Sequence, residues 1–396
     1  MHVLIIPSWY PETPESTDGI FFRQQAQALH RHGVRVGVTA PIFRSPRTHK
    51  HTILSTNYGI FEYEEDGVAT LAYHSMYFFP RVPYLDRNRW IAAGKKLFRR
   101  YVAKYGRPDI IHAHSMNHAG VLAHQIHQET GIPYVLTEHS STYARKLIAD
   151  WQRPTMQQAA ENCARRLAVS KSFCTLLQQE YLGLDWDYLP NILSPQFETP
   201  FQTAVEKSSN EFVFCSVGHL NRNKGFDILL PAFAQALKTH PDLRLRIGGG
   251  GALMHDLQQT VKKLGIDHAV TFYGALSYDQ VLDMMRASDA FVLASRTETF
   301  GVVFIEALSQ GLPVIATKCG GPESIVTNNN GFLVPTENIE ALTSGLVKLY
   351  EQRHRYRPSE LRQNCLNEYG ETGITNRLIN IYQEIIEPAG RTTENA

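Results

Sequence analysis

Short apolar runs alternate with amphipathic helical patterns along nearly the whole chain of 396 residues. A buried strand, a crossover helix and another buried strand in succession are typical of parallel sheets covered by helices. In the first half we predict helices at 21–32 and 116–129 and strands at 3–6, 34–39, 110–112, 134–137, 167–169 and 188–190. In the second half we predict strands at 212–217, 243–247, 270–272, 290–293 and 313–316. The pattern therefore predicts doubly wound α/β folds, in which ligands bind beyond the carboxyl ends of the strands.

The chain is longer than one compact core usually fills, and its length predicts two domains of roughly 200 residues each. Residues 198–210 show no apolar period and are rich in small polar side chains, which indicates a linker. We therefore expect an N-terminal domain at 1–197, a C-terminal domain at 198–372 and a C-terminal helix within 373–396. The region 356–369 reads as irregular. The helix after it could pack on either domain, including back on the N-terminal one.

Charge and cysteine content argue against several classes of protein. The net charge is +1, with 21 basic against 16 acidic residues in 1–195 and 18 against 22 in the remainder. The imbalance predicts an anionic partner for the first half, whereas the near-neutral total argues against nucleic-acid binding. The five cysteines lie far apart and form no C-x-x-C pair. Their spacing argues against a disulfide scaffold or a zinc site.

Apolar and basic segments bear on membrane contact. The apolar run at 2–7 is too short for a signal peptide, and no stretch approaches the ~20 apolar residues of a membrane span. We therefore expect a cytoplasmic protein. Residues 87–107 hold eight basic side chains interleaved with apolar ones at helical spacing. Such a helix suits either peripheral contact with an anionic membrane, at the inner face of the plasma membrane, or a domain helix whose apolar face points inward.

A strand-to-helix turn in the second half carries two cations. The predicted strand 212–217 runs into the segment 218–225 (GHLNRNKG), which includes Arg222 and Lys224 and leads into a helical pattern. Glycines, cations and the N-terminal end of a helix converge here, and this combination favours a diphosphate. The Walker pattern is absent, so the turn is not a P-loop. The alternative is a solvated turn, since arginine and lysine are common in loops.

A second loop, 248–251, consists of four glycines after the strand 243–247. Without side chains, Gly249 and its neighbours let a flat ring or another stretch of backbone approach closely. A nucleotide base lying against this loop and a plain flexible turn both fit the pattern.

Two carboxylates, Glu298 and Glu306, flank the start of a predicted helix that follows a buried strand. Phe300 and Gly301 permit close approach, and the amides from Gly301 to Val303 would face an anion. Glu306 lies on an otherwise apolar face, where a carboxylate is costly to bury unless it is paired. A ligand diol is therefore a candidate partner for it. The alternatives are a helix-start carboxylate for Glu298 and a solvent-exposed residue for Glu306.

Together these segments resemble glycosyltransferase family 4. The resemblance is dense over 212–336, through 218–225 (GHLNRNKG), the glycine loop, 272–274 (FYG), 288–289 (SD), Glu298-x7-Glu306 and 311–316 (GLPVIA). It is looser in the first half, through 18–20 (DGI), 108–114 (PDIIHAH) and 137–139 (TEH). The resemblance implies a retaining reaction and the GT-B fold, in which two doubly wound Rossmann-like domains face one another across a cleft.

The resemblance also implies roles for residues of the second half. Arg222 and Lys224 would bind the donor diphosphate, and Glu306 the ribose hydroxyls. Glu298 would hold the donor sugar and take part in catalysis. The other implied donor contacts come from small or apolar residues of the two loops: Gly249, Phe300, Gly301, Val302 and Val303.

In the first half the resemblance assigns a catalytic role to His139, which would reach across the cleft to the donor sugar near the reacting carbon. Gly19 opens a helix and would approach the phosphates or the acceptor. His112 and His114 alternate along a strand end, and we favour packing roles over metal ligation for them. None of the motifs that carry the resemblance contains the metal-binding D-x-D pattern. We therefore expect neither a metal nor another cofactor.

The implied function is transfer of a hexosyl or N-acetylhexosaminyl group from a nucleotide sugar, a UDP-sugar first and GDP-mannose next. The acceptor would be a glycan or lipid-linked molecule in the synthesis of cell-surface polysaccharide, such as lipopolysaccharide, or of glycolipid. The N-terminal domain would bind the acceptor and the C-terminal domain the donor. The alternatives are a non-catalytic subunit that binds nucleotide sugars and another GT-B enzyme, such as a phosphorylase or an epimerase. Glu298 acting as a covalent nucleophile is an alternative mechanism.

Overall fold

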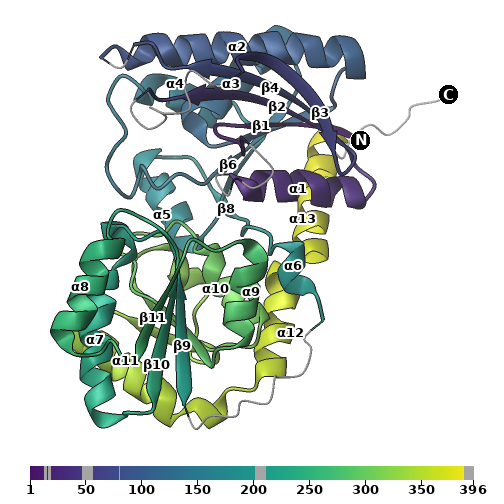
Figure 1. Cartoon of the computed structure of the whole chain (residues 1–396). Coiled ribbons are helices and arrows are strands. Elements are labelled where there is room, and N and C mark those ends of the chain that lie inside the picture. The colour runs from purple at the N-terminus through teal and green to yellow at the C-terminus, as the bar shows by residue number, and fades with distance from the viewer. Residues whose placement is uncertain (13–15, 17–18, 47–56, 80, 201–210, 388–396) are drawn as a thin grey trace. The chain divides into compact units, whose positions relative to one another are not determined.

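The computed structural model describes residues 1–12, 16, 19–46, 57–79, 81–200 and 211–387. It divides into two compact units (Figure 1). The N-terminal unit holds the described residues of 1–169, 174–192 and 372–396, and the C-terminal unit those of 170–173 and 193–371. The predicted linker falls largely on residues 201–210, which lie outside the described ranges.

The N-terminal unit is built on an eight-stranded sheet in the order β3-β4-β2-β1-β5-β6-β7-β8. The strands are β1 (His2–Pro7), β2 (Arg35–Arg44), β3 (Gly59–Glu65), β4 (Val68–Met76), β5 (Ile110–His114), β6 (Tyr134–Glu138), β7 (Arg165–Ala168) and β8 (Asp187–Tyr188). The central strands pair in parallel, as the buried apolar runs predict.

The edge of this sheet corrects the sequence prediction, which missed β3 and β4. These two strands form an antiparallel hairpin, so the sheet is mixed and not wholly parallel. The turn between them holds Asp66 and Gly67, both with positive φ. Aspartate followed by glycine is a characteristic hairpin turn, and it is visible in the sequence. The strand β3 has no fully buried residue, and therefore it lacks the apolar run that marks the other strands.

Helices of the N-terminal unit are α1 (Ile20–Arg31), α2 (Pro83–Tyr105), the π-helical turn η1 (Met116–Gly120), α3 (Val121–Thr130), α4 (Arg153–Glu161), α5 (Lys171–Glu180) and α13 (Glu371–Ile386). The single helix predicted at 116–129 is thus a π turn followed by an α-helix. The C-terminal helix α13 places Ile374, Leu378 and Tyr382 in the same buried cluster as the strands β1 and β2. The Tyr382 hydroxyl lies 2.5 Å from His112 Nδ1, which ties the helix to β5.

The basic helix α2 packs its apolar stripe into the N-terminal unit. Trp90, Leu97 and Tyr101 are buried, and the Trp90 indole donates to the carbonyl of Pro41 at 2.9 Å. Basic side chains on the other face pair with acidic neighbours, as Lys95 does with Glu129 at 2.7 Å. The packing supports the alternative in which the apolar face of this helix points inward.

The C-terminal unit holds a six-stranded sheet in the order β11-β10-β9-β12-β13-β14, and all its pairs are parallel. The strands are β9 (Phe212–Val217), β10 (Leu243–Gly248), β11 (Val270–Gly274), β12 (Ala290–Leu293), β13 (Val314–Thr317) and β14 (Gly331–Val334). The edge strand β14 was not predicted; it has only four residues, and two of them are half buried.

Helices of the C-terminal unit are α6 (Pro195–Glu198), the 3-10 turns η2 (Arg222–Lys224), η3 (Gly321–Ser324) and η4 (Arg353–Arg355), and α7 (Phe226–Thr239), α8 (Met254–Leu264), α9 (Tyr278–Arg286), α10 (Val302–Ser309), α11 (Ile339–Glu351) and α12 (Pro358–Tyr369). The region predicted to be irregular, 356–369, is mostly α12. Its buried residues are only Leu361, Cys365 and Tyr369, one per turn, so the apolar period is weak.

None of the helices in the described ranges combines the length and the apolarity that crossing a bilayer requires.

Candidate active site

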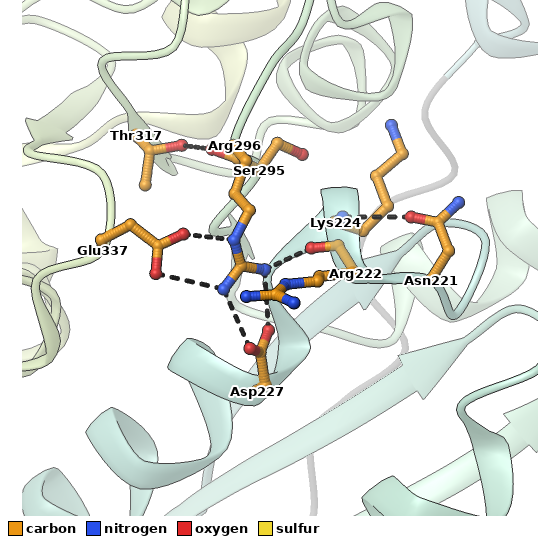
Figure 2. Close-up of polar contacts among 8 residues, drawn as sticks. All are labelled: Asn221, Arg222, Lys224, Asp227, Ser295, Arg296, Thr317 and Glu337. Atoms are coloured by element: carbon orange, nitrogen blue, oxygen red, sulfur yellow. Dashed lines mark hydrogen bonds and ion pairs between the residues drawn. The ribbon is translucent and has the colours of Figure 1, made fainter.

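The loop after β9 and the loop after β12 meet at the carboxyl edge of the C-terminal sheet. The Asn221 side chain accepts a hydrogen bond from the backbone N–H of Lys224 at 3.3 Å and so caps the short turn η2 (Figure 2). Gly225 ends this turn with a φ of 67°. A Cβ at Gly225 would lie 1.9 Å from the carbonyl oxygen of Ala294, at the end of β12. The close approach of these two loops therefore requires glycine.

Lys224 and Glu298 form an ion pair across this junction. The Lys224 ammonium donates to Glu298 Oε1 at 2.5 Å, and the Ser295 hydroxyl donates to the same oxygen at 2.7 Å. The side chains of Lys224 and Glu298 are only 21% and 13% exposed. A charged pair shielded in this way is less screened than a surface pair and stays well oriented. The sequence predicted a separate partner for each residue and did not predict their pairing.

Arg222 differs from Lys224 in its surroundings. Arg222 is exposed, and no carboxylate in the described ranges pairs with its guanidinium. Its backbone carbonyl accepts a hydrogen bond from the Arg296 side chain (Figure 2). The turn thus offers one cation in solvent and one cation held by a carboxylate, an arrangement able to bind a diphosphate.

Arg296 is a residue of the site that sequence reasoning missed. Its guanidinium makes two hydrogen bonds of 2.9 Å to Asp227 at the start of α7 and also contacts Glu337 (Figure 2). The hydrogen bond to Asp227 is the largest cause that raises the pKa of Arg296. The backbone N–H of Arg296 donates to the carbonyl of Asn223 at 2.7 Å. Arg296 therefore fastens the cationic turn to the Glu298 loop.

The glycine loop after β10 packs on the cationic loop. The N–H of Gly218 donates to the carbonyl of Gly248 at 3.0 Å, and the N–H of Leu220 to that of Gly250 at 2.8 Å. A Cβ at Gly249 would lie 2.0 Å from the carbonyl oxygen of Gly218. The sequence left open whether a flat ring or another stretch of backbone approaches this loop. In the structure the backbone of Gly218 lies against Gly249.

Gly301 is the N-cap of α10 with a φ of 95°, and Val302 and Val303 form the first turn of this helix. The amides of a first helical turn have no acceptor within the helix and are available to an anion or a hydroxyl. Both valine side chains are half buried, whereas the Phe300 side chain is buried and packs against Tyr369 at a ring distance of 6.0 Å. Phe300 can therefore meet a ligand only through its backbone.

Glu306 lies on α10 and is buried, which rules out the solvent-exposed alternative. Burial raises the pKa of Glu306 to about 7, because the charged form loses its hydration. No hydrogen bond or ion pair to its carboxyl is made by the residues that the structure describes. With a pKa of about 7, a buried carboxyl that has no partner among the described residues is about half protonated at pH 7. It is therefore able both to accept hydrogen bonds from a diol and to donate them to it.

In the N-terminal unit, Gly19 and His139 lie at the carboxyl edge of the sheet. Gly19 precedes α1 with a φ of 74°, and a Cβ there would lie 2.9 Å from the Trp9 side chain. The rings of Phe21 and Phe22, on the first turn of α1, pack on His139 at 5.1 and 5.0 Å. The structure therefore brings Gly19 and His139 to one place, although the sequence separates them widely.

His139 is buried and neutral. Burial is the largest cause that lowers the pKa of His139 to about 3; the nearby His112 also lowers this pKa, whereas the neighbouring Asn191 side chain raises it. Its Nε2 atom lies 3.0 Å from His114 Nδ1, whereas its Nδ1 atom has no hydrogen-bond partner in the described ranges. One ring nitrogen is thus fixed by His114 and the other is available to a ligand.

Glu138 is a second residue that sequence reasoning missed, although it stands within the TEH motif. Its buried carboxylate accepts hydrogen bonds from the backbone N–H groups of Met116 at 2.7 Å, His139 at 2.9 Å and Ser140 at 2.8 Å. Burial raises the pKa of Glu138, while these hydrogen bonds lower it. Three backbone contacts from one carboxylate fix the loop that carries His139.

Comparison with known proteins places this architecture among glycosyltransferases. The model described as Glycosyl transferases group 1 matches residues 198–370, and the model described as Glycosyltransferase Family 4 matches residues 19–191. The chain therefore belongs to glycosyltransferase family 4, with the GT-B fold, as the sequence predicted.

Three similar proteins illustrate the breadth of the family. Over 199 residues the chain is 31% identical to the phosphatidylinositol N-acetylglucosaminyltransferase gpi3 subunit of Schizosaccharomyces pombe. The aligned residues make up 50% of this chain and 43% of that protein. The sucrose-phosphate synthase structure from Thermosynechococcus elongatus matches with a TM-score of 0.77 at 19% identity, over 97% of this chain and 99% of that one. Anabaena HepE in complex with UDP and glucose matches with a TM-score of 0.71 at 18% identity, over 96% of this chain and 98% of that one. The two structures establish the fold alone.

Proposed function

We propose that this glycosyltransferase is a retaining enzyme that transfers a hexosyl or N-acetylhexosaminyl group from a nucleotide sugar. The observation that carries the proposal is the shielded Lys224–Glu298 ion pair beside the exposed Arg222, at the carboxyl edge of the C-terminal sheet. Cations at this edge suit a donor diphosphate, and Glu306, about one turn into α10, suits the ribose hydroxyls.

The transfer needs charge stabilisation more than a protein nucleophile. The bond between C1 of the sugar and the diphosphate oxygen breaks, and the acceptor oxygen bonds to C1 on the same face. The proton of the acceptor hydroxyl passes to the departing phosphate. Arg222 and Lys224 stabilise the charge that develops on this phosphate, and the oriented groups around it supply positioning. In this proposal His139 contacts the donor sugar as a neutral hydrogen-bonding group.

A UDP-sugar is the first donor to test, and GDP-mannose the next. The complex of Anabaena HepE with UDP and glucose supports this order, since that protein shares the fold. The experiment measures turnover and thermal shift with UDP-, GDP-, ADP- and dTDP-sugars. We expect one class of donor to raise the melting temperature of the protein and to be consumed. We expect EDTA to leave the rate unchanged, because cationic side chains bind the diphosphate in place of a metal ion. Consumption of inorganic phosphate without a sugar nucleotide would identify a phosphorylase instead.

Replacing Lys224 by alanine tests the diphosphate assignment. The loss of one charge-assisted hydrogen bond of roughly 1.5–3 kcal/mol should weaken donor binding at least tenfold. Lys262→Ala, which removes an exposed lysine from α8, is the matched control and should bind donor like the unaltered protein. Circular dichroism checks that both variants fold. Equal donor affinities for the two variants would disprove the assignment.

We further propose a glycan or lipid-linked acceptor, handled at the inner face of the plasma membrane. The phosphatidylinositol in the name of the fission-yeast relative supports a lipid acceptor. Contact with the membrane would use only the charges of α2, because its apolar stripe is buried. Lys96→Ser with Arg99→Ser, both exposed, should weaken binding to phosphatidylserine vesicles at low salt by about 1 kcal/mol per charge. Lys262→Ser with Lys263→Ser on α8 is the control, and equal binding by both double variants would remove the membrane proposal.

A further inference from the structure

A cavity of about 510 Å³ lies within the N-terminal unit, at the carboxyl ends of β2, β4 and β5. This volume lies within the range of small-molecule sites, roughly 300–1,000 Å³. Its wall combines aromatic rings with a few polar side chains, and the lining residues that carry the argument are Tyr77, Phe79, Arg87, Asn117, His118 and Trp151. The donor-site residues of the C-terminal unit are not among them.

The rim of this cavity is held in place by Asp86, on the first turn of α2. Its buried carboxylate accepts hydrogen bonds from the backbone N–H groups of Phe78 at 3.0 Å and Phe79 at 2.7 Å. Arg89 donates to the same carboxylate at 2.7 Å, and its guanidinium covers the Phe78 ring. Asp86 is therefore fully engaged in shaping the rim, and its charge is compensated by Arg89.

Arg87 is the uncompensated charge of the wall. Its guanidinium lies 4.7 Å from the centre of the Trp151 ring and donates one hydrogen bond, of 2.8 Å, to the hydroxyl of Thr155. No carboxylate of the described ranges forms an ion pair with it, and its Nε atom is buried without a partner. A guanidinium stacked on an aromatic ring keeps its in-plane N–H donors free, and these suit a carboxylate or a phosphate.

Other polar groups of the wall are neutral and available. Burial, with a smaller contribution from the nearby Arg87, lowers the pKa of His118 to about 4, so this ring is uncharged at pH 7. Asn117 accepts a hydrogen bond from Gln152 at 2.7 Å through its oxygen, which leaves its amide N–H groups to donate. The Tyr77 hydroxyl makes no hydrogen bond with the described residues. These groups match hydroxyls better than further charges.

We infer that this cavity binds the acceptor as a sugar or cyclitol ring that carries a phosphate or carboxylate group. The anionic group bonds to Arg87, the ring hydroxyls bond to Asn117 and Tyr77, and an apolar C–H face of the ring lies on Trp151 or Phe79. Aromatic faces carry negative charge density and attract such C–H faces. The identification of this ring as the acceptor rests on the proposed function. The cavity and the Arg87 cation without an ion-pair partner are observed independently of it.

The test titrates the full chain with glucose 6-phosphate, glucuronate and glucose, each in the presence of saturating UDP and GDP so that phosphate binding at the donor site is blocked. Saturation-transfer NMR gives the dissociation constants. We expect both anionic sugars to bind and glucose to bind at least tenfold more weakly. Arg87→Gln and Trp151→Ala should each weaken glucose 6-phosphate at least tenfold, and Arg87→Lys should recover part of the loss. Arg31→Gln, which removes an exposed arginine at the end of α1, is the matched control and should change nothing.

Several results would overturn the inference. Binding of glucose as tightly as of glucose 6-phosphate would remove the role of the anion. If folded Arg87→Gln and Trp151→Ala variants bound glucose 6-phosphate unchanged, the cavity would not be the binding site. If neither anionic sugar bound to the unaltered protein, the inference would also be wrong. If vesicles that contain phosphatidylinositol displaced glucose 6-phosphate, the natural ligand would be a lipid headgroup. If they did not displace it, the natural ligand would be a free sugar. Because the titration needs no turnover, failure of the proposed transfer reaction would leave its outcome readable.

Discussion

Glu298→Gln should lower kcat on the order of 10²-fold, with the KM for the donor changed much less. A carboxylate that contacts the donor sugar gains strength as positive charge develops on the ring, and such an interaction appears in kcat. In the structure Glu298 is held by Lys224 and Ser295, so its carboxylate is already oriented before the donor binds. Steady-state kinetics with the donor identified by the panel give both parameters.

Glu306→Gln is the matched comparison for Glu298→Gln. Glu306 is proposed to contact the ribose, which does not change during transfer, so its replacement should act mainly on KM. A loss of kcat confined to Glu306→Gln would show that the roles of the two glutamates are exchanged. If Glu298→Gln instead raised KM as Lys224→Ala does and left kcat intact, Glu298 would only position Lys224.

Gly225→Ala should lower the free energy of unfolding by about 3 kcal/mol. An alanine pays roughly 1–2 kcal/mol in the left-handed region, and forcing a group into a packed site costs a further 1–3 kcal/mol. Here the new Cβ would lie 1.9 Å from the carbonyl oxygen of Ala294.

Gly265→Ala is the control for the packing part of this loss. Gly265 has the same φ of 67°, but no atom lies within 4 Å of its Cβ position. We expect only the conformational cost of roughly 1–2 kcal/mol there. Urea denaturation of both variants measures the difference, and equal losses would show that the two loops can separate without cost.

Most of the parallel strands could be predicted from the sequence because their buried residues read as continuous apolar runs. The strand β4 was missed although it pairs with β2 in parallel and is mostly buried. The strand β3 lies at a sheet edge, where no residue is fully buried and glutamates interrupt the apolar run. The strand β14, at an edge of the other sheet, has only four residues, and two of them are half buried. The helix α12 was missed for a related reason, since one buried residue per turn gives a weak period. The Asp66–Gly67 turn shows that a local signal for the hairpin was present and was not used.

The components of the site could be predicted, but not their partners. Lys224 and Glu298 are 74 residues apart, and only the fold shows that they form an ion pair. Arg296 stands inside the predicted loop, yet its importance comes from Asp227 and Glu337, which lie on other elements. Gly249 was predicted to make room for a neighbour, and the structure shows that this neighbour is the backbone of Gly218. The burial of His139 and Glu306 likewise depends on elements distant in sequence.

The anomeric configuration of the product tests the central claim most directly. The enzyme is given the α-linked nucleotide sugar that the donor panel identifies, together with its acceptor, and the proton NMR spectrum of the product is recorded. A retaining glycosyltransferase yields an α-linked product, and this is the result that we predict. A β-linked product formed from the α-linked donor would contradict the proposed mechanism.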